Sequence, residues 1–443
     1  MYTKNKYLKN NSLFKSLFLI FFAANTTYAI SGAELKKDSD DVELTRRLDA
    51  VGTGPYFGIG SEYDGSDLVV LQPNIHKDLG ILKQQQRTAR FTGETCGPKN
   101  PYVQLSGFLE AQATLETESR NHINLTASNL DLSAWVNKYF SAYTNFGVDT
   151  DDTSEQNFRM ILGFITIGNL NVSPFYASAG QMFVPFGSFS TGTSSIGAIP
   201  RSMGRIVEQA ISAGYYSERN GLHITGAVYD GKTQNSNHRN VDQFAGTISH
   251  NINFNIQSIP SSLKTGVSYT NNIADAAVLR SIFKRNASLR HYVPGIDVFA
   301  KFNFGPIVLR EEYVTALEKF NKTDITQNGH SVKPGSFLSE IEYDTYIYGK
   351  GTAFVLHYSR IFQGALASPI KHQYGFNTTV NVLKDTMVSL EYAIRSSYSN
   401  HNLLPTPTAT TFTNLNPFVV SSLNSSFSGR NKSVLVLTLD LFF

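Results

Sequence analysis

The chain has 443 residues, of which 16% are charged and 12% aromatic, and its formal net charge is +3 at pH 7. This charge is too small to indicate a nucleic-acid partner, and the single cysteine, Cys96, excludes an intramolecular disulfide framework. The cysteines and histidines show no metal-site spacing, so we expect no metal and no cofactor. No P-loop, nucleophile elbow or zinc-protease motif is present, and an enzyme is therefore not expected.

The chain begins with the pattern of a secretory signal peptide. Lysines precede a short apolar run at 16–24, and Thr27-Tyr28-Ala29 then supplies the small residues of a cleavage site. Residues 1–29 are predicted to be removed, so that the mature chain begins near Ile30. An uncleaved anchor is the alternative, but a spanning helix needs a longer run of roughly 20 residues.

Residues 30–100 differ in character from the rest of the mature chain. Residues 38–48 are charged with a rough helical spacing of apolar residues, and residues 51–82 mix glycines with a short apolar run. We expect either a periplasmic extension or a small, plug-like segment that reaches into a barrel lumen, with a plain linker as the alternative. The segment is too short for a complete plug domain.

Residues 101–443 are predicted to form an all-β domain. Apolar and polar residues alternate in segments separated by turn residues, which is typical of a transmembrane antiparallel up-and-down β-barrel. The pattern predicts sixteen strands, an even number as in single-chain bacterial barrels. These strands are expected near 102–116, 123–137, 139–149, 156–168, 172–184, 206–217, 221–230, 241–253, 262–272, 295–305, 307–318, 336–347, 351–362, 371–382, 385–397 and 431–443.

The connections between these strands alternate in length. Every second connection is tight apart from residues 254–261, and the other set contains the long connections, such as 273–294 and 398–430. Outer-membrane barrels combine short periplasmic turns with long extracellular loops, so the asymmetry favours a bacterial outer-membrane protein over a soluble sandwich. One stretch of small residues, 188–198, either folds into the lumen and narrows it or forms an ordinary surface loop.

Charged residues on the polar strand faces are expected to line a water-filled lumen, for which sixteen strands leave room. Opposed acidic and basic rows would select what passes, whereas ion pairing that only stiffens the wall is the alternative. Catalysis is not expected from Glu340 and Glu342, which lie about 7 Å apart on one strand without a nucleophile. The lumen candidates are Glu110, Lys264, Lys301, Glu340, Glu342, Asp344, Arg360, Glu391 and Arg395.

A second group of charged residues lies in the long connection 273–294. It is predicted to attract a small anionic ligand or to contact lipopolysaccharide phosphates at the cell surface. Outer-membrane lipid and lipopolysaccharide are therefore expected partners. The members of this basic cluster are Arg280, Lys284, Arg285, Arg290 and His291.

The end of the chain carries the clearest strand pattern. The pattern resembles the C-terminal sorting signal of bacterial outer-membrane proteins, and we expect the barrel-assembly machinery to bind it. A strand of a soluble sandwich is the alternative reading. The residues that share one face are Leu435, Leu437, Leu439, Leu441 and Phe443.

Three stretches of the chain form recognisable motifs. They are Gly60-Ser61-Glu62-Tyr63-Asp64-Gly65 with the adjoining Ser66 to Val70, then Pro73, Ile75 and Asp78-Leu79, and also 104–111 and 180–187. These stretches are similar to those of a known family, the LbtU-type siderophore porins. The resemblance covers most of the mature chain, and it implies a sixteen-stranded barrel that takes up an iron–siderophore complex without an energy-coupled plug. No individual ligand-contacting residue carries over.

Two other functions remain open from the residues alone. One is a general or anion-preferring porin for small solutes. The other is an outer-membrane enzyme or adhesin, for which His357 and His372 are the nearest catalytic candidates, although no serine motif accompanies them.

Overall fold

The structure is a computed structural model that describes residues 75–91, 101–117, 121–147, 159–193, 199–235, 241–283, 289–327, 330–364, 370–383, 386–398 and 431–442. These residues form a closed barrel of sixteen antiparallel strands, so the predicted fold and strand number are confirmed. The predicted signal peptide, residues 1–29, lies outside the described residues. The barrel strands are β1 (Tyr102–Glu116), β2 (His122–Trp135), β3 (Phe140–Gly147), β4 (Arg159–Gly168), β5 (Phe175–Phe183), β6 (Val207–Ser217), β7 (Leu222–Asp230), β8 (Gln243–Ile256), β9 (Ile259–Thr270), β10 (Gly295–Phe304), β11 (Ile307–Ala316), β14 (Gly335–Ile347), β15 (Lys350–Phe362), β16 (Ile370–Leu383), β17 (Thr386–Ser397) and β18 (Asn431–Phe442).

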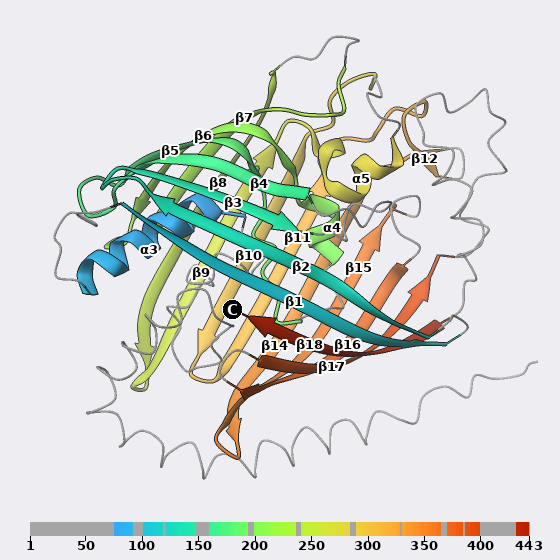
Figure 1. Cartoon of the computed structure of the whole chain (residues 1–443). Coiled ribbons are helices and arrows are strands. Elements are labelled where there is room, and N and C mark those ends of the chain that lie inside the picture. Colours follow the sequence, from blue (N-terminus) through green and yellow to red (C-terminus); the bar gives the residue numbers. More distant parts are fainter. Residues whose placement is uncertain are drawn as a thin grey trace, which may run out of the picture. The chain divides into compact units, whose positions relative to one another are not determined.

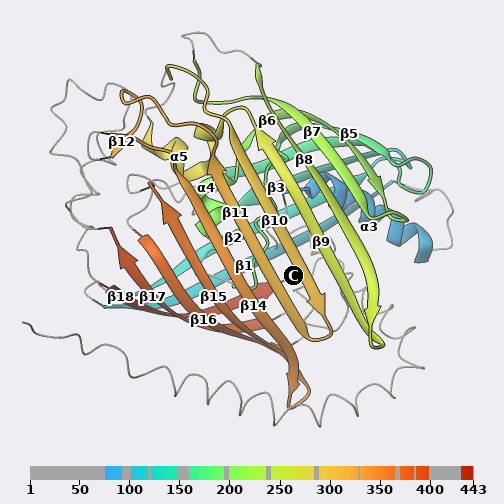
Figure 2. The same cartoon turned by 180° about the vertical axis from the view of Figure 1, so that it is seen from behind.

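The sheet closes on itself because its first and last strands pair. β1 runs antiparallel to β18, with Glu110 opposite Asp440 and Ala113 opposite Leu437 (Figures 1 and 2). All other strands pair with their neighbours in the chain, and β11 pairs with β14 because a small hairpin, β12 (Thr326–Gln327) and β13 (His330–Ser331), lies in their connection. Closure leaves no open sheet edge, which is the condition for a sheet to stand in lipid.

One turn is tighter than the sequence predicted. Residues 254–261 were expected to be a connection, but β8 and β9 continue through them, with Asn255 paired to Pro260 and Ile256 to Ile259. Gln257 and Ser258 form the turn with φ of 47° and 70°. Two successive positive φ values are those of a type I′ turn, whose twist matches that of the flanking strands. Ser258 and Pro260 are residues typical of turns, and the sequence analysis extended the connection on both sides of them.

Alternate residues of each strand face opposite sides of the wall. In β18, Leu437 is 49% exposed, whereas Val436 and Asp440 are 5% and 2% exposed. An outer apolar face and a polar inner face are the arrangement of a strand between lipid and a lumen. The protein is therefore a multi-pass outer-membrane β-barrel. Outward apolar residues around the barrel include Val103, Leu105, Leu132, Ile165, Ile211, Val228, Ile248, Val267, Val298, Leu309, Leu390, Leu437 and Leu439.

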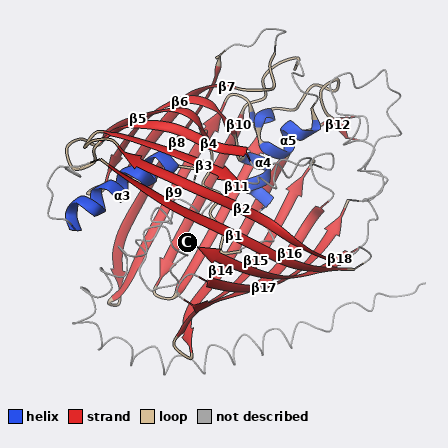
Figure 3. Ribbon diagram, in the orientation of Figure 1, coloured by secondary structure: helices blue, strands red, loops and turns tan. Residues whose placement is uncertain are grey.

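Apolar side chains also gather inside the barrel, beneath two of the long connections. The connection between β5 and β6 contains α4 (Ile199–Gly204), and the one between β9 and β10 contains η1 (Ile273–Asp275) and α5 (Ala277–Ile282). Figure 3 shows α4 and α5 together near one end of the barrel, which we call the long-loop end, and the opposite end is the short-turn end. The buried cluster there includes Val184, Phe186, Phe189, Met203, Leu279 and Phe320.

A further helix, α3 (Lys77–Phe91), precedes the barrel in the chain. Its side chains from Lys77 to Leu82 are buried, as are Gln84 and Gln85, whereas Lys83 and Gln86 are half-buried. None of the described helices has the length and apolar composition of a membrane span.

The outward face of β18 generates the first prediction. Leu437→Arg places a charge near the middle of the lipid-facing surface and should lower the free energy of unfolding by about 2–4 kcal/mol. Urea unfolding followed by heat-modifiable migration measures the loss. Thr114→Arg is the matched control, because Thr114 faces the lumen opposite Val436. Equal losses in the two variants would contradict the assignment of faces.

Candidate functional site in the lumen

Eight of the nine predicted lumen residues lie on the inner face of the wall. Each shares its face with the buried residues of its strand, whereas the residues on either side of it are half-buried or exposed. Glu340 and Glu391 are buried there. The eight are Glu110, Lys264, Lys301, Glu340, Glu342, Asp344, Glu391 and Arg395.

The ninth residue, Arg360, was placed on the wrong face. Its neighbours Ser359 and Ile361 are 0% and 1% exposed, so they face inward and Arg360 faces outward. The sequence misled because the inner face of β15 is partly apolar at the long-loop end, where Ile361 packs in the buried cluster under the folded-in connections. A rule that assigns charged residues to the lumen fails at such a position.

The connection between β5 and β6 crosses the lumen to the opposite wall. The backbone N–H groups of Ser188 and Phe189 donate to Glu312 Oε1 over 2.8 and 2.7 Å. Further along, the Thr191 hydroxyl donates to Glu340 Oε1 over 2.6 Å, and the Gly192 N–H donates to Glu340 Oε2 over 3.1 Å. Residues 188–193 therefore follow the inward-folded alternative, while 194–198 lie outside the described residues. We call residues 188–193 the inner loop.

An arginine that the sequence analysis missed holds the acids beneath the inner loop. Arg310 Nη1 lies 2.8 Å from Glu342 Oε2 and 3.9 Å from Glu340 Oε2. A Cβ atom on Gly192 would lie 2.1 Å from Glu342 Oε2, so glycine is required for this close approach. Arg310 was missed because β11 carries charged residues in succession, Arg310, Glu311 and Glu312, which leaves its faces ambiguous in the sequence.

Arg310 also completes a row of three basic residues across neighbouring strands. Lys264 of β9 is opposite Lys301 of β10, and Lys301 is opposite Arg310 of β11. All three lie on the inner face. Like charges in adjacent register positions repel, so such a row is stabilised by acids beside it or by an anion in the lumen. We call these residues the basic row.

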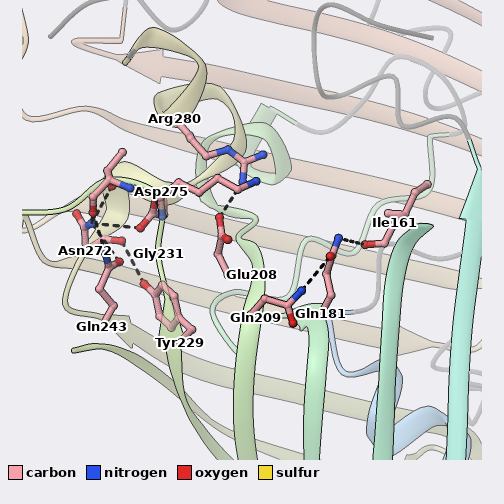
Figure 4. A network of polar contacts seen from close by, with 12 residues as sticks. Ile161, Gln181, Glu208, Gln209, Tyr229, Gly231, Gln243, Asn272, Asp275 and Arg280 are labelled. Atoms are coloured by element: carbon pink, nitrogen blue, oxygen red, sulfur yellow. Dashed lines mark hydrogen bonds and ion pairs between the residues drawn. The ribbon is translucent and has the colours of Figure 1, made fainter. Parts of the chain in front are cut away.

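The connection between β9 and β10 also folds inward, and this changes the interpretation of Arg280. Its guanidinium lies 2.9 Å from the Glu208 carboxylate of β6, and the side chain is only 19% exposed (Figure 4). Arg280 is thus tied to the inner wall and is not part of an exposed basic cluster. The sequence could not show this, because Glu208 lies 72 residues away.

The other members of the predicted basic cluster are dispersed. The Arg290 backbone N–H donates to Asp324 Oδ2 over 3.1 Å, and His291 Nε2 lies 4.0 Å from Glu318 Oε2. Lys284 and Arg285 lie outside the described residues.

Asp275 organises the base of the same connection. Its Oδ1 accepts from the backbone N–H groups of Lys232 and Thr233, and its Oδ2 accepts from the Asn272 amide (Figure 4). Burial raises the pKa of Asp275 to about 6, and the backbone donors oppose this shift. These bonds join the β7–β8 and β9–β10 connections at the long-loop end.

Helix α3 lies against the inner wall near the short-turn end. Ser212 Oγ of β6 donates to Asp78 Oδ2 over 3.3 Å, and Leu79 and Leu82 pack against Tyr176 of β5. These two strand residues face the lumen, so the first turns of α3 lie inside the barrel. Burial lowers the pKa of Lys77 to about 8, while Asp131 raises it.

The two histidines considered for catalysis lie on opposite faces of the wall. His357 is buried on the lumen side, where its ring Nε2 accepts from Gln373 Nε2 over 3.1 Å. His372 faces outward and bonds with the Tyr358 hydroxyl at 3.0 Å. They therefore cannot act together on one substrate.

Comparisons with known proteins agree with this fold. A family profile described as "Protein of unknown function (DUF3573)" matches residues 106–286. A UPF0422 protein of Coxiella burnetii is 30% identical over 404 residues, which cover 88% of this chain and 83% of that protein. A UPF0422 protein of Legionella pneumophila is 25% identical over 370 residues, which cover 77% of this chain and 68% of the relative. The anion-selective porin from Comamonas acidovorans superposes with a TM-score of 0.52 at 14% identity, covering 78% of this chain and 100% of the porin, which shows a shared fold.

The fit of Gly192 generates a prediction about the inner loop. Gly192→Val should displace the loop from the wall, because the Glu342 carboxylate is held by Arg310 and cannot easily move aside. Single-channel conductance in planar bilayers should rise as the lumen widens. Gly226→Val is the control, since the nearest atom to a Cβ there is 3.7 Å away. Wild-type conductance in Gly192→Val would show that the inner loop does not narrow the path.

Proposed function

The chain belongs to the UPF0422 family and has a porin-like outer-membrane channel fold, and we propose that it takes up a small anionic iron–siderophore complex without an energy-coupled plug domain. Two observations support this proposal. One is the resemblance of its motifs to those of the LbtU-type siderophore porins. The other, which carries the mechanism, is the basic row on the inner wall.

The basic row offers an anionic ligand a place to bind along the lumen. Lys264, Lys301 and Arg310 stand at one level on three successive strands. Arg310 is paired with Glu342, so the positive charge that the row adds to this wall comes chiefly from Lys264 and Lys301. An anionic chelate that passes the narrowed section would thus meet positive charge at one wall. Charged side chains lining a pore select the sign of the permeating species in this way.

The inner loop supports selection by size. It lies across the lumen beside the basic row, with the Gly192 carbonyl accepting from Asn377 Nδ2 of β16 over 3.2 Å. Contacts with β11, β14 and β16 hold it in one position. A ligand would therefore pass between a fixed loop, which limits its size, and a charged wall, which attracts its negative charge.

Helix α3 is proposed to be the plug-like element of the channel. It carries a mostly polar sequence, KDLGILKQQQRTARF, as expected for a helix in a wet lumen. The Asp78–Ser212 bond and the contact of Lys83 Nζ with the Tyr216 ring at 4.5 Å join it to the wall. Such an element narrows the path without sealing it.

A general anion-preferring porin is the second candidate, and the basic row favours it equally. The two functions differ in which solutes the cell no longer takes up when the protein is absent. A siderophore channel carries one class of chelate, whereas a general porin carries many small solutes.

Uptake measurements separate these functions. A strain lacking this protein should take up less iron–siderophore complex, and in the wild type uptake should persist without the inner-membrane energy-coupling complex. In the double variant Lys264→Gln and Lys301→Gln, uptake should fall about tenfold, which corresponds to about 1.4 kcal/mol. The double variant Lys319→Gln and Lys322→Gln, in an exposed connection, is the charge-matched control. Unchanged siderophore uptake with reduced general permeability in the deletion strain would leave the general porin instead.

The role of α3 is tested separately. Deletion of residues 75–91 should raise single-channel conductance, because the helix occupies part of the lumen at the short-turn end. Heat-modifiable migration reports whether the barrel remains folded. An intact barrel with wild-type conductance would exclude a plugging role.

A further inference from the structure

The outward-facing Arg360 belongs to a structured patch near the long-loop end of the wall. It is the third residue from the end of β15, and its guanidinium carbon lies 4.6 Å from the centre of the Phe362 ring. On the next strand, His372 stands directly opposite Arg360. The His372 ring bonds through Nδ1 to the Tyr358 hydroxyl at 3.0 Å. We call Tyr358, Arg360, Phe362, His372 and Tyr374 the rim patch.

Aromatic rings surround the two basic groups. Tyr358 and Tyr374 have ring centres 4.8 Å apart, and Tyr313 meets Phe362 edge to face at 6.2 Å. Tyr374 is 57% exposed on the outer face. Rings at this level form the interfacial girdle of a barrel, where one end of a side chain is apolar and the other is wet.

The guanidinium has no acidic partner among the residues that the structure describes. No described carboxylate lies within 4.0 Å of it, and its Nε atom is buried without a hydrogen-bond partner. On the outward faces of β11, β14, β15 and β16, as far as they are described, the one acid is Glu311. Its carboxylate, on β11, accepts from Ser339 Oγ of β14 over 2.6 Å, and Tyr358 follows on the next strand, β15. The rim patch is therefore positively charged, and no acid of the described wall compensates the charge of Arg360.

We propose that the rim patch binds a phosphate of a phosphorylated lipid headgroup in the outer leaflet. The long-loop end faces outside in barrels of this type, which places Arg360 at headgroup level. A planar guanidinium stacked on a ring keeps its N–H fork directed at a phosphate and forms two parallel bonds. When the Tyr358 hydroxyl donates to Nδ1 of His372, the proton of that ring lies on Nε2, which supplies a third donor.

This site is separate from the channel and from the cluster first predicted to contact lipopolysaccharide. That cluster includes Arg280, which is bound to Glu208 inside the barrel. The rim patch instead lies on the lipid side of a wall whose inner face carries Ser359 and Ile361. Changes at Arg360 should consequently leave conductance unaltered.

Binding of bisphosphorylated lipid A to the full-length protein in detergent, followed by native mass spectrometry, tests the proposal. Arg360→Gln should weaken binding about tenfold or more, because a hydrogen bond to a charged group contributes roughly 1.5–3 kcal/mol. His372→Gln should have a smaller effect in the same direction. Arg219→Gln, in an exposed turn at the short-turn end, is the matched control and should bind as the wild type does.

The competing source of phosphate is tested in the same experiment. Inorganic phosphate should not displace lipid A, because it makes no contact with the aromatic rings. Full displacement by inorganic phosphate would overturn the assignment to a lipid. Wild-type affinity of Arg360→Gln for lipid A, with heat-modifiable migration and conductance intact, would overturn the site itself.

Discussion

In the hydrocarbon core of a membrane, a backbone N–H or C=O group without a partner costs several kcal/mol, and this molecule is organised around that constraint. The pairing of β1 with β18 satisfies the last open edge, so each barrel strand has a neighbour on both sides. Once the strands are paired, their side chains must alternate between lipid and lumen. Whether a wall position takes an apolar or a polar residue then depends on which of the two alternating faces of its strand it occupies.

The same constraint reaches the connections that fold inward. Backbone N–H groups carried into the lumen need acceptors there, and carboxylates of the wall supply them. Glu312 accepts two such groups, and Glu340 accepts one together with a hydroxyl. These acids therefore have a structural task that an inventory of lumen charges does not reveal. A permeating ligand therefore meets only the charged groups of the wall that the inner loop does not cover.

Two charged residues at the long-loop end have different roles because they lie on different sides of the wall. Both are arginines. Arg280 is bound to Glu208 in the lumen, whereas Arg360 lies on the lipid-facing side, against the ring of Phe362. The difference arises because the folded-in connections make the inner face partly apolar there. Ile361 is on that face, and a charged neighbour is thereby turned outward. The rim patch and the channel are thus products of the same packing.

The sequence by itself determined the barrel. Period-two alternation and turn residues are local signals, so the strand positions, their number and the lipid-facing leucines of β18 could all be predicted. Phe443, the last residue of that pattern, lies outside the described residues. Eight of the nine lumen residues were found in the same way, since parity along a strand is also local.

Only the tertiary structure decided which residues meet across the lumen. Gly192 and Glu340 are 148 residues apart, and Asp78 and Ser212 are 134 residues apart. No local pattern encodes such contacts, because they depend on the closure of the barrel and on the path of the inner loop through it. The face of Arg360, the partner of Arg280 and the position of α3 are consequences of that closure, in which side chains distant in the chain compete for one confined polar interior.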